Sequence, residues 1–238
     1  MKNALILLSG GLDSATTLYY VKNKLKPKKI ICLFIDYGQL ALKEEEYCSR
    51  NLSKKIKAKF KKINLKWLGD ISQSLTNKKG KIPKTDPRNI VKEKKQLLRW
   101  WVPSRNTIFL AAALAHAESK FLSKKEKYEI YIGLKHEGKV PMKDTTKEFI
   151  QEFNKLAIHS THHGKYKIIA PLIDLDKDEI VKLAHSLNVP IESTYSCYIG
   201  SKFIKNKLIH CGTCSNCIQR KQAFYWANIK DPTSYKNI

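Results

Sequence analysis

The sequence has no long apolar run and no segment typical of membrane or secretory targeting. No apolar stretch approaches the ~18 residues that a membrane-spanning helix needs. Lys2 precedes only five successive apolar residues, 4–8, before a pair of glycines, which is too short for a signal peptide. We therefore expect a cytoplasmic protein without a membrane partner. Its 238 residues, 42% of them hydrophobic, suffice for one substantial globular core.

Acidic residues and arginines are both scarce. The chain has 21 acidic against 45 basic side chains, which gives a formal net charge of +24. Only five of the basic residues are arginines, and the rest are lysines. Specific recognition of phosphates and bases usually recruits the planar guanidinium group as well. The charge therefore favours a solvated, lysine-coated surface, and we do not expect specific nucleic-acid binding.

Cysteine is scarce over most of the chain, because four of the six cysteines lie within residues 197–238. Cys211, Cys214 and Cys217 form two successive C-x-x-C spacings, and Cys197 lies fourteen residues before the first of them. In a reducing compartment such clustering favours a metal over disulfides. Four thiolates would satisfy a structural Zn²⁺ with no open position, and an iron–sulfur cluster has compatible ligands. We expect zinc at this site.

A glycine-rich turn near the N-terminus is the most specific feature of the sequence. The apolar run 4–8 predicts a buried strand, and it is followed by Ser9, Gly10, Gly11, Leu12, Asp13 and Ser14. Helical spacing comes next, and Asp13 or Ser14 is predicted to cap that helix. A strand, a glycine turn and a helix aim backbone N–H groups and the positive helix end at one point, where an anion can bind. No Gly-Lys-Ser/Thr closes the turn, which excludes a Walker-type loop.

Apolar runs alternate with helical patterns along the chain. This alternation predicts a Rossmann-like α/β fold, a five-stranded parallel sheet with helices on both faces. The expected strands are 4–8, 29–35, 60–65, 128–134 and 167–172, and the expected helices include 40–56, 107–115, 145–158 and 177–187. Between residues 66 and 101 the pattern gives way to a long basic connection. We expect an α/β domain over 1–192 and a metal-binding segment over 193–238 packed on it.

Some residues that suggest chemistry have structural interpretations. Asp174, Asp176 and Asp178 lack the glycine and the terminal Glu of an EF-hand, whereas Asp176 with Glu179 fits a capping box for helix 177–187. Cys32 is expected in the core of a strand, and Cys48 on a helix without an evident partner.

The turn at residues 9–14 resembles the SGGxDS loop of the PP-loop ATP pyrophosphatases, which bind ATP and pass AMP to an acceptor oxygen. Further blocks are similar to the QueC family, the 7-cyano-7-deazaguanine synthases, and follow the family order over residues 9–224. These blocks are Tyr37-Gly38-Gln39, Val102-Pro103-Ser104-Arg105-Asn106, Thr194-Tyr195-Ser196-Cys197-Tyr198, and Cys211 through Arg220 with Ala223-Phe224. The last is specific, because most other PP-loop families lack it.

The resemblance implies an ATP-dependent ligase that converts 7-carboxy-7-deazaguanine with ammonia, through the amide, to the nitrile. Adenylation would give the carboxylate, a poor electrophile, a good leaving group. The resemblance implies that residues 9–14 hold the pyrophosphate of ATP and that Asp13 is a partner for Mg²⁺. It also implies a homodimer. The residues that it places at the substrate are Tyr37, Gln39, Arg105, Asn106 and Asp144, and those that it makes catalytic are Asp13, Arg105 and Asn106.

Two segments depart from the family pattern. Family members usually carry Tyr-Pro-Asp-Cys-Arg where this chain has Met-Lys-Asp-Thr-Thr at 142–146, so only Asp144 is kept. The basic and polar residues usual after Tyr-Gly-Gln are replaced by Leu40 and Ala41. These changes leave ATP activation intact and leave the acceptor and the product open. A QueC-like enzyme of antiphage defence would couple the activated deazaguanine to a protein or another amine.

A tRNA-modifying PP-loop enzyme is a further alternative, which the net charge of +24 favours. A thiolase would need a catalytic cysteine pair, and only Cys32 and Cys48 remain outside the metal cluster. Lysidine-type ligases lack the four-cysteine block. An RNA-binding module without enzymatic activity would leave residues 9–14 and Arg105-Asn106 unexplained.

Overall fold

The computed structural model describes residues 2–78, 84, 98–136, 138, 141–200 and 208–236. Its centre is a five-stranded sheet in the order β3-β2-β1-β4-β5, in which each neighbouring pair is parallel. The strands are β1 (Asn3–Leu7), β2 (Ile30–Asp36), β3 (Lys59–Asn64), β4 (Tyr128–Tyr131) and β5 (Ile168–Ile169). The predicted parallel α/β fold is confirmed, although β4 and β5 are shorter than the apolar runs that predicted them.

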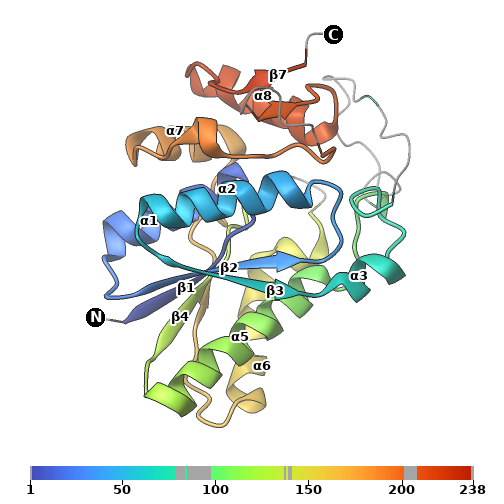
Figure 1. The fold of residues 1–238 in the computed structure, drawn as a ribbon. Coiled ribbons are helices and arrows are strands. Elements are labelled where there is room, and N and C mark those ends of the chain that lie inside the picture. The colour runs from blue at the N-terminus through green and yellow to red at the C-terminus, as the bar shows by residue number, and fades with distance from the viewer. Residues whose placement is uncertain are drawn as a thin grey trace.

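Helices cover both faces of the sheet (Figure 1). The α-helices are α1 (Leu12–Tyr20), α2 (Leu42–Lys55), α3 (Lys66–Ile71), α5 (Arg105–Lys124), α6 (Lys147–Ser160), α7 (Lys177–Ser186) and α8 (Ser215–Ala227). In the view of Figure 1, α1 and α2 lie above the sheet with α7 and α8 beyond them, and α5 and α6 lie below it. Among the described residues, no helix is both long and apolar enough to cross a membrane.

Strand β1 shows why the central strands are apolar on both faces. Ala4, Ile6 and Leu8 belong to a buried cluster with residues of α1, α7 and α8, whereas Leu5 and Leu7 pack with residues of α5 and α6. Successive side chains of a strand point to opposite faces, so a strand covered on both sides must be apolar throughout. The run 4–8 therefore encodes a central position in the sheet.

The strand order reverses beside β1. The chain runs outward from β1 through β2 to β3, and then returns to the other side of β1 to form β4 and β5. Loops that leave the carboxyl ends of the two strands at such a switch point turn away from each other and leave a crevice between them. The glycine turn follows β1 and opens into this crevice.

The start of α1 differs from the prediction. Gly11 is the N-cap of this helix, and no side chain caps it. Asp13 instead lies in the first turn and contacts Lys177, and the Ser14 hydroxyl donates to the carbonyl of Gly11 at 3.0 Å. The prediction of Asp13 or Ser14 as the cap is wrong, because the helix begins directly after the second glycine. The predicted capping box of Asp176 and Glu179 on α7 is confirmed.

The described part of the connection 66–101 is more ordered than its composition predicted. It contains helix α3, and the backbone N–H of Leu75 donates to the carbonyl of Arg99 at 2.9 Å. This bond brings the two ends of the connection together and places the buried ring of Trp100 beside the crevice. Most of the lysine-rich stretch between them lies outside the described residues.

The C-terminal part contains a feature that the sequence did not predict, a short parallel pair of strands, β6 (Ile209–His210) and β7 (Ser234–Tyr235). Arg220 of α8 is fully buried beneath it and donates hydrogen bonds to the hydroxyls of Thr194, Ser196 and Thr233. A buried guanidinium needs several acceptors, and these join the segments on either side of the cysteine cluster. The boundary at 192/193 stays a prediction.

Candidate active site

A cleft opens at the carboxyl ends of β1, β2 and β4. It consists of two adjoining hollows of about 280 and 290 Å³ that share Asp13, Glu45 and Arg105. The predicted site residues that line it are Ser9, Gly11, Leu12, Asp13, Ser14, Tyr37, Gln39, Arg105 and Asn106. Gly10 and Asp144 are buried and do not line it. The fold therefore brings together three segments that are far apart in the sequence.

The glycine turn is held in place by close contacts on two sides. Gly10 has φ of +82°, and a Cβ there would lie 2.6 Å from the carbonyl oxygen of Glu45 and 2.9 Å from the Cβ of Cys48. Only glycine fits this conformation and this space. From the other side, the backbone N–H of Tyr195 donates to the carbonyl of Gly10 at 2.9 Å. Helix α2 and the C-terminal segment therefore fix the shape of the turn.

The polar groups of the turn face the cleft. The hydroxyls of Ser9 and Ser14 lie 3.1 Å apart, and the backbone N–H of Gly11 points at the Ser9 oxygen at 3.4 Å. Both serines line the cleft at the N-terminal end of α1. Hydroxyls, backbone N–H groups and a positive helix end together suit a phosphate group.

Lys177 is a cation that the sequence analysis did not select. Its Nζ lies 2.6 Å from both carboxylate oxygens of Asp13, and both residues line the cleft. Burial lowers the pKa of Lys177, and the Asp13 carboxylate opposes that effect. The residue is the first of α7, directly after the capping Asp176. The sequence around this helix start predicted a capping box, which explains Asp176 and Glu179 structurally. It gave no separate indication that the neighbouring lysine faces the cleft.

A second group of side chains is built around Arg105, the first residue of α5. Arg105 hydrogen-bonds the hydroxyl of Tyr37, and its charge acts on Asp144 and on Glu45. Burial raises the pKa of Tyr37 to about 12, against the influence of Arg105, so the phenol stays protonated at neutral pH. Arg105 thus presents a fixed positive charge to the cleft.

Asn106 and Asp144 hold the start of α5 in position. The Asn106 side-chain amide donates to the backbone carbonyl of Asp144 at 2.9 Å, and its backbone N–H points at the Asp144 carboxylate at 3.4 Å. Burial raises the pKa of Asp144, against the effect of Arg105. These contacts give both residues a positioning role toward Arg105, while their predicted contact with substrate stays a prediction.

Gln39 is occupied by the protein itself. Its side-chain carbonyl accepts from the backbone N–H of Tyr37, and its amide donates to the carbonyl of Ile35 and to the carboxylate of Glu45. Burial raises the pKa of Glu45 to about 7, although Gln39 and Arg105 act in the opposite sense. Glu45 is the second residue on the cleft that the sequence analysis missed, because the spacing over residues 40–56 predicted a helix and nothing more.

Two aromatic rings complete this part of the cleft. Trp100 and Tyr198 stack with their ring centroids 4.4 Å apart and their planes 19° from parallel, and both line the cleft. Tyr198 follows Cys197 directly, so the metal-binding segment contributes to the cleft surface. A flat apolar surface next to fixed polar groups suits a heterocycle.

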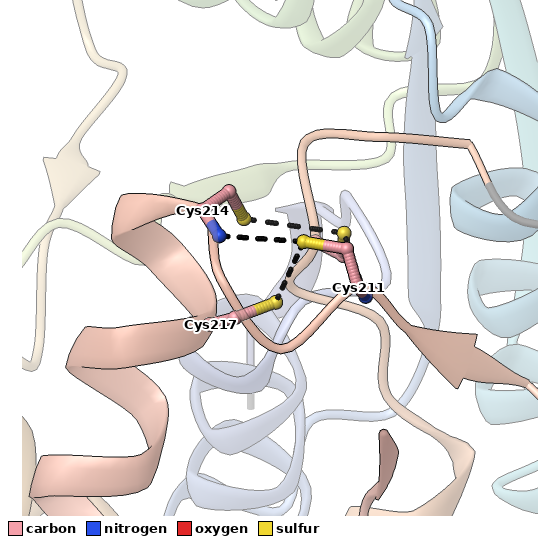
Figure 2. Close-up of side chains that lie close together, drawn as sticks. Cys211, Cys214 and Cys217 are labelled. Carbon is pink, nitrogen blue, oxygen red and sulfur yellow. Dashed lines mark hydrogen bonds between the residues drawn. The ribbon is translucent and has the colours of Figure 1, made fainter. Parts of the chain in front are cut away.

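The four C-terminal cysteines converge on one point. Their sulfur atoms all lie within 4.8 Å of one another, and Figure 2 shows Cys211, Cys214 and Cys217 directed together from a loop and the start of α8. Backbone N–H groups of Thr213 and Cys214 point at the Cys211 sulfur at 3.5 and 3.3 Å. Four buried sulfurs with N–H donors around them suit a thiolate-bound metal with no open position. The prediction of a four-cysteine site is thus supported by geometry.

The metal-binding segment and the glycine turn are neighbours. Cys48 on α2 packs in the same buried cluster as the four cysteines, and its Cβ is one of the atoms that exclude a side chain at Gly10. Cys48 lies on α2 as predicted, as a free cysteine outside the set of four sulfurs. Ser215, Asn216 and Gln219 of α8 line the cleft as well. The cysteine cluster thus supports the cleft that contains the predicted anion site.

A comparison with known proteins agrees with this arrangement. The profile of the family described as "Queuosine biosynthesis protein QueC" matches residues 3–228. The chain belongs to the QueC family. It is 34% identical over 238 residues to the 7-cyano-7-deazaguanine synthase of Methanosphaera stadtmanae and 36% identical over 240 residues to that of Methanococcus maripaludis strain S2. Each alignment covers 98% of this chain and 98% of the relative. The predicted family and the predicted ligase-type enzyme are confirmed.

The fold also matches a solved PP-loop structure. A 4-thiouridine synthetase–RNA complex with bound ATP superposes with a TM-score of 0.51 at 20% sequence identity, over 95% of this chain and 50% of that chain. At this identity the likeness supports the fold alone. It agrees with the predicted PP-loop architecture.

The segments that depart from the QueC family pattern lie on or next to the cleft. Met142 and Thr145 line it, and so does Ala41, where the family usually has a basic or polar residue. Asp144, the residue that is kept, is the one that holds the start of α5. The departures therefore change the cleft surface and leave the support of Arg105 in place.

Proposed function

We propose that this protein uses ATP to convert the carboxylate of 7-carboxy-7-deazaguanine, with ammonia, to the amide and then to the nitrile. The observation that carries the proposal is the full-length relationship to enzymes named 7-cyano-7-deazaguanine synthase, combined with one cleft in which groups suited to a phosphate lie near an arginine and two stacked aromatic rings. The groups suited to a phosphate belong to Ser9, Gly11, Ser14 and Lys177, and the arginine and the two rings are those of Arg105, Trp100 and Tyr198.

The first half of the reaction makes the amide. A carboxylate oxygen attacks the α-phosphorus of ATP and displaces pyrophosphate, which leaves an acyl adenylate. Ammonia then attacks the acyl carbon, AMP leaves with its oxygen, and a proton is lost. Hydroxyls and N–H groups of residues 9–14 and the Lys177 ammonium would hold the departing pyrophosphate, and Arg105 would hold the substrate carboxylate against the α-phosphate.

The second half removes the amide oxygen. That oxygen attacks the α-phosphorus of another ATP, pyrophosphate leaves, and loss of AMP with two N–H protons forms the nitrile. Mg²⁺, when bound, would neutralise phosphate charge, and the predicted carboxylate for it is Asp13. Asp13 pairs with Lys177 at 2.6 Å, so a bound Mg²⁺ would compete with the lysine for this carboxylate. We further propose zinc as the metal of the four cysteines, with a structural role.

Incubation of the purified protein with ATP, Mg²⁺, ammonia and 7-carboxy-7-deazaguanine tests the proposal. We expect mass spectrometry to detect the nitrile with two AMP formed for each molecule of nitrile. AMP formation only when a protein or another amine replaces ammonia would favour the antiphage-defence alternative, which the altered cleft residues at 41, 142 and 145 motivate. No AMP with any amine would contradict the adenylation step.

The tRNA-thiolase alternative finds little support in the described cysteines. Burial raises the pKa of the Cys32 and Cys48 thiols to about 12, so neither would be a thiolate at neutral pH. The other four cysteines are directed at one another. Tight, structure-selective binding of bulk tRNA at two salt concentrations would revive this alternative.

A further inference from the structure

The lining of the cleft contains two acidic residues among those the structure describes, Asp13 and Glu45. Asp13 is neutralised by Lys177 at 2.6 Å. Glu45 has no such ion pair in the described part of the chain; the hydrogen bond recorded for it comes from the neutral amide of Gln39, at 2.9 Å. A carboxylate therefore faces a cleft that, under the proposed function, must admit ATP and a carboxylate substrate.

The position of this carboxylate is fixed. Gln39 donates to its Oε2 and is itself held by the backbone of Tyr37 and Ile35. The second carboxylate oxygen of Glu45, Oε1, has no hydrogen bond among the described residues, and Glu45 lines both hollows of the cleft. Burial raises the pKa of Glu45 to about 7, so the surroundings of this side chain disfavour its charge. Such a group is stabilised by a ligand that supplies N–H donors.

The chemistry of the proposed substrate supplies those donors in a fixed order. Along one edge, 7-carboxy-7-deazaguanine presents its carboxylate, then the O6 acceptor, then the N1–H donor and the exocyclic 2-amino donor. A guanidinium matches the first two groups, and a carboxylate matches the last two. Arg105 and Glu45 line the same cleft, and the Arg105 charge acts on Glu45. The stacked rings of Trp100 and Tyr198 add a flat surface beside them.

We propose that Glu45 is the specificity-determining residue for the heterocycle, and that its carboxylate accepts hydrogen bonds from N1–H and the 2-amino group of the deazaguanine. Gln39 is the positioning residue that holds this carboxylate. The inference rests on the proposed function and names the part of the cleft that recognises its substrate. It assigns selection of the 2-aminopyrimidinone ring to a residue of α2 outside the blocks that carry the family resemblance.

Isothermal titration with two ligands tests the inference. The ligands are 7-carboxy-7-deazaguanine and its analogue without the 2-amino group. We expect wild-type protein to bind the first roughly 10-fold or more tightly than the second, because a hydrogen bond to a charged group is lost with the amine. Glu45→Gln should bind 7-carboxy-7-deazaguanine roughly 10- to 100-fold more weakly and discriminate between the two ligands by less than about 3-fold. Glu46→Gln is the matched control, since Glu46 is the next residue on α2 and pairs with Arg50 and Lys62 away from the cleft; it should bind like wild type.

Three results would overturn the inference. Discrimination that persists in Glu45→Gln would do so, and so would unchanged ligand affinity with a reduced kcat, which would make Glu45 a base for ammonia. A loss of affinity for Mg·ATP alone would make it a metal ligand instead. If Glu45→Gln does not fold, Glu45→Asp is the second variant; it keeps the charge but withdraws it by one methylene, and should bind less tightly than wild type. Failure of the wild-type protein to bind either heterocycle would instead contradict the proposed function.

Discussion

The two groups of side chains on the cleft differ in how they are built. The first, at the glycine turn, comes mainly from one continuous stretch, 9–14, with Lys177 added from α7. The second is assembled from the loop after β2, from α2, from α5 and from the C-terminal segment, which supply Tyr37, Glu45, Arg105 and Tyr198. A phosphate can be bound by a local backbone shape, whereas a heterocycle must be recognised by side chains on several of its edges.

Metal removal should have the largest effect, because the cysteine segment contributes to both groups. Tyr195 donates to the carbonyl of Gly10 at the turn, and Tyr198 stacks on Trp100 beside Arg105. We expect chelation, or Cys217→Ser, to lower the midpoint of thermal unfolding by roughly 10 °C or more and to abolish binding of both ATP and the heterocycle. Metal analysis and differential scanning calorimetry measure this.

Cys48→Ala is the control for metal removal, because Cys48 packs against the cluster without contributing to the set of four sulfurs. It should keep a full equivalent of metal. Loss of metal without loss of ATP affinity would separate the cysteine segment from the glycine turn and contradict the structural link between them.

Lys177→Met should separate the two groups most sharply. Removal of the lysine paired with Asp13 takes away a donor to the phosphates and leaves a carboxylate uncompensated beside them. We expect the rate of AMP formation to fall roughly 10²- to 10³-fold, while the dissociation constant of the heterocycle changes little. Lys182→Met on the same helix, where Lys182 pairs with Asp178, should leave both unchanged. A comparable loss of heterocycle binding would show that the two groups do not act separately.

Gly10→Ala should affect the turn through the backbone alone. A positive φ disfavours alanine, and the added Cβ would lie 2.6 Å from a carbonyl oxygen, so we expect a loss of about 2–4 kcal/mol in the free energy of unfolding. Gly138→Ala is the matched control, because Gly138 has φ of +70° but, apart from its chain neighbours, no atom of the described residues lies within 4 Å of the added Cβ. It should cost only about 1 kcal/mol. If urea denaturation gives the same loss in the free energy of unfolding for both variants, steric crowding around Gly10 is not the reason that glycine is needed there.

The comparison of the two groups also explains what could be predicted from the sequence. The sheet, the glycine turn and the four cysteines follow from local spacing, because apolar runs, paired glycines and C-x-x-C each carry their own structural meaning. Lys177 and Glu45 could not be found in this way, since each gains its role only from a partner far away in the sequence, Asp13 or Gln39. Gln39 shows a different limit, because the motif marked it as a substrate contact, which stays a prediction, and gave no sign that its amide also holds Glu45.

The smallest expected effect is a pH-dependent gain in stability for Glu45→Gln. Burial raises the pKa of Glu45 from an ordinary 4.5 to about 7, so between these values the folded protein binds a proton that the unfolded chain has lost. The contribution of Glu45 to wild-type stability should therefore fall as pH rises from about 4.5 to about 7 and then level off, and the variant should lack this contribution. At pH 8 we expect Glu45→Gln to be more stable than wild type by on the order of 2 kcal/mol, with no gain at pH 4. Thermal unfolding of both proteins across this range measures the difference. A variant less stable than wild type at pH 8 would mean that the charged carboxylate stabilises the fold. It would contradict the view that burial of this carboxylate lowers the free energy of unfolding.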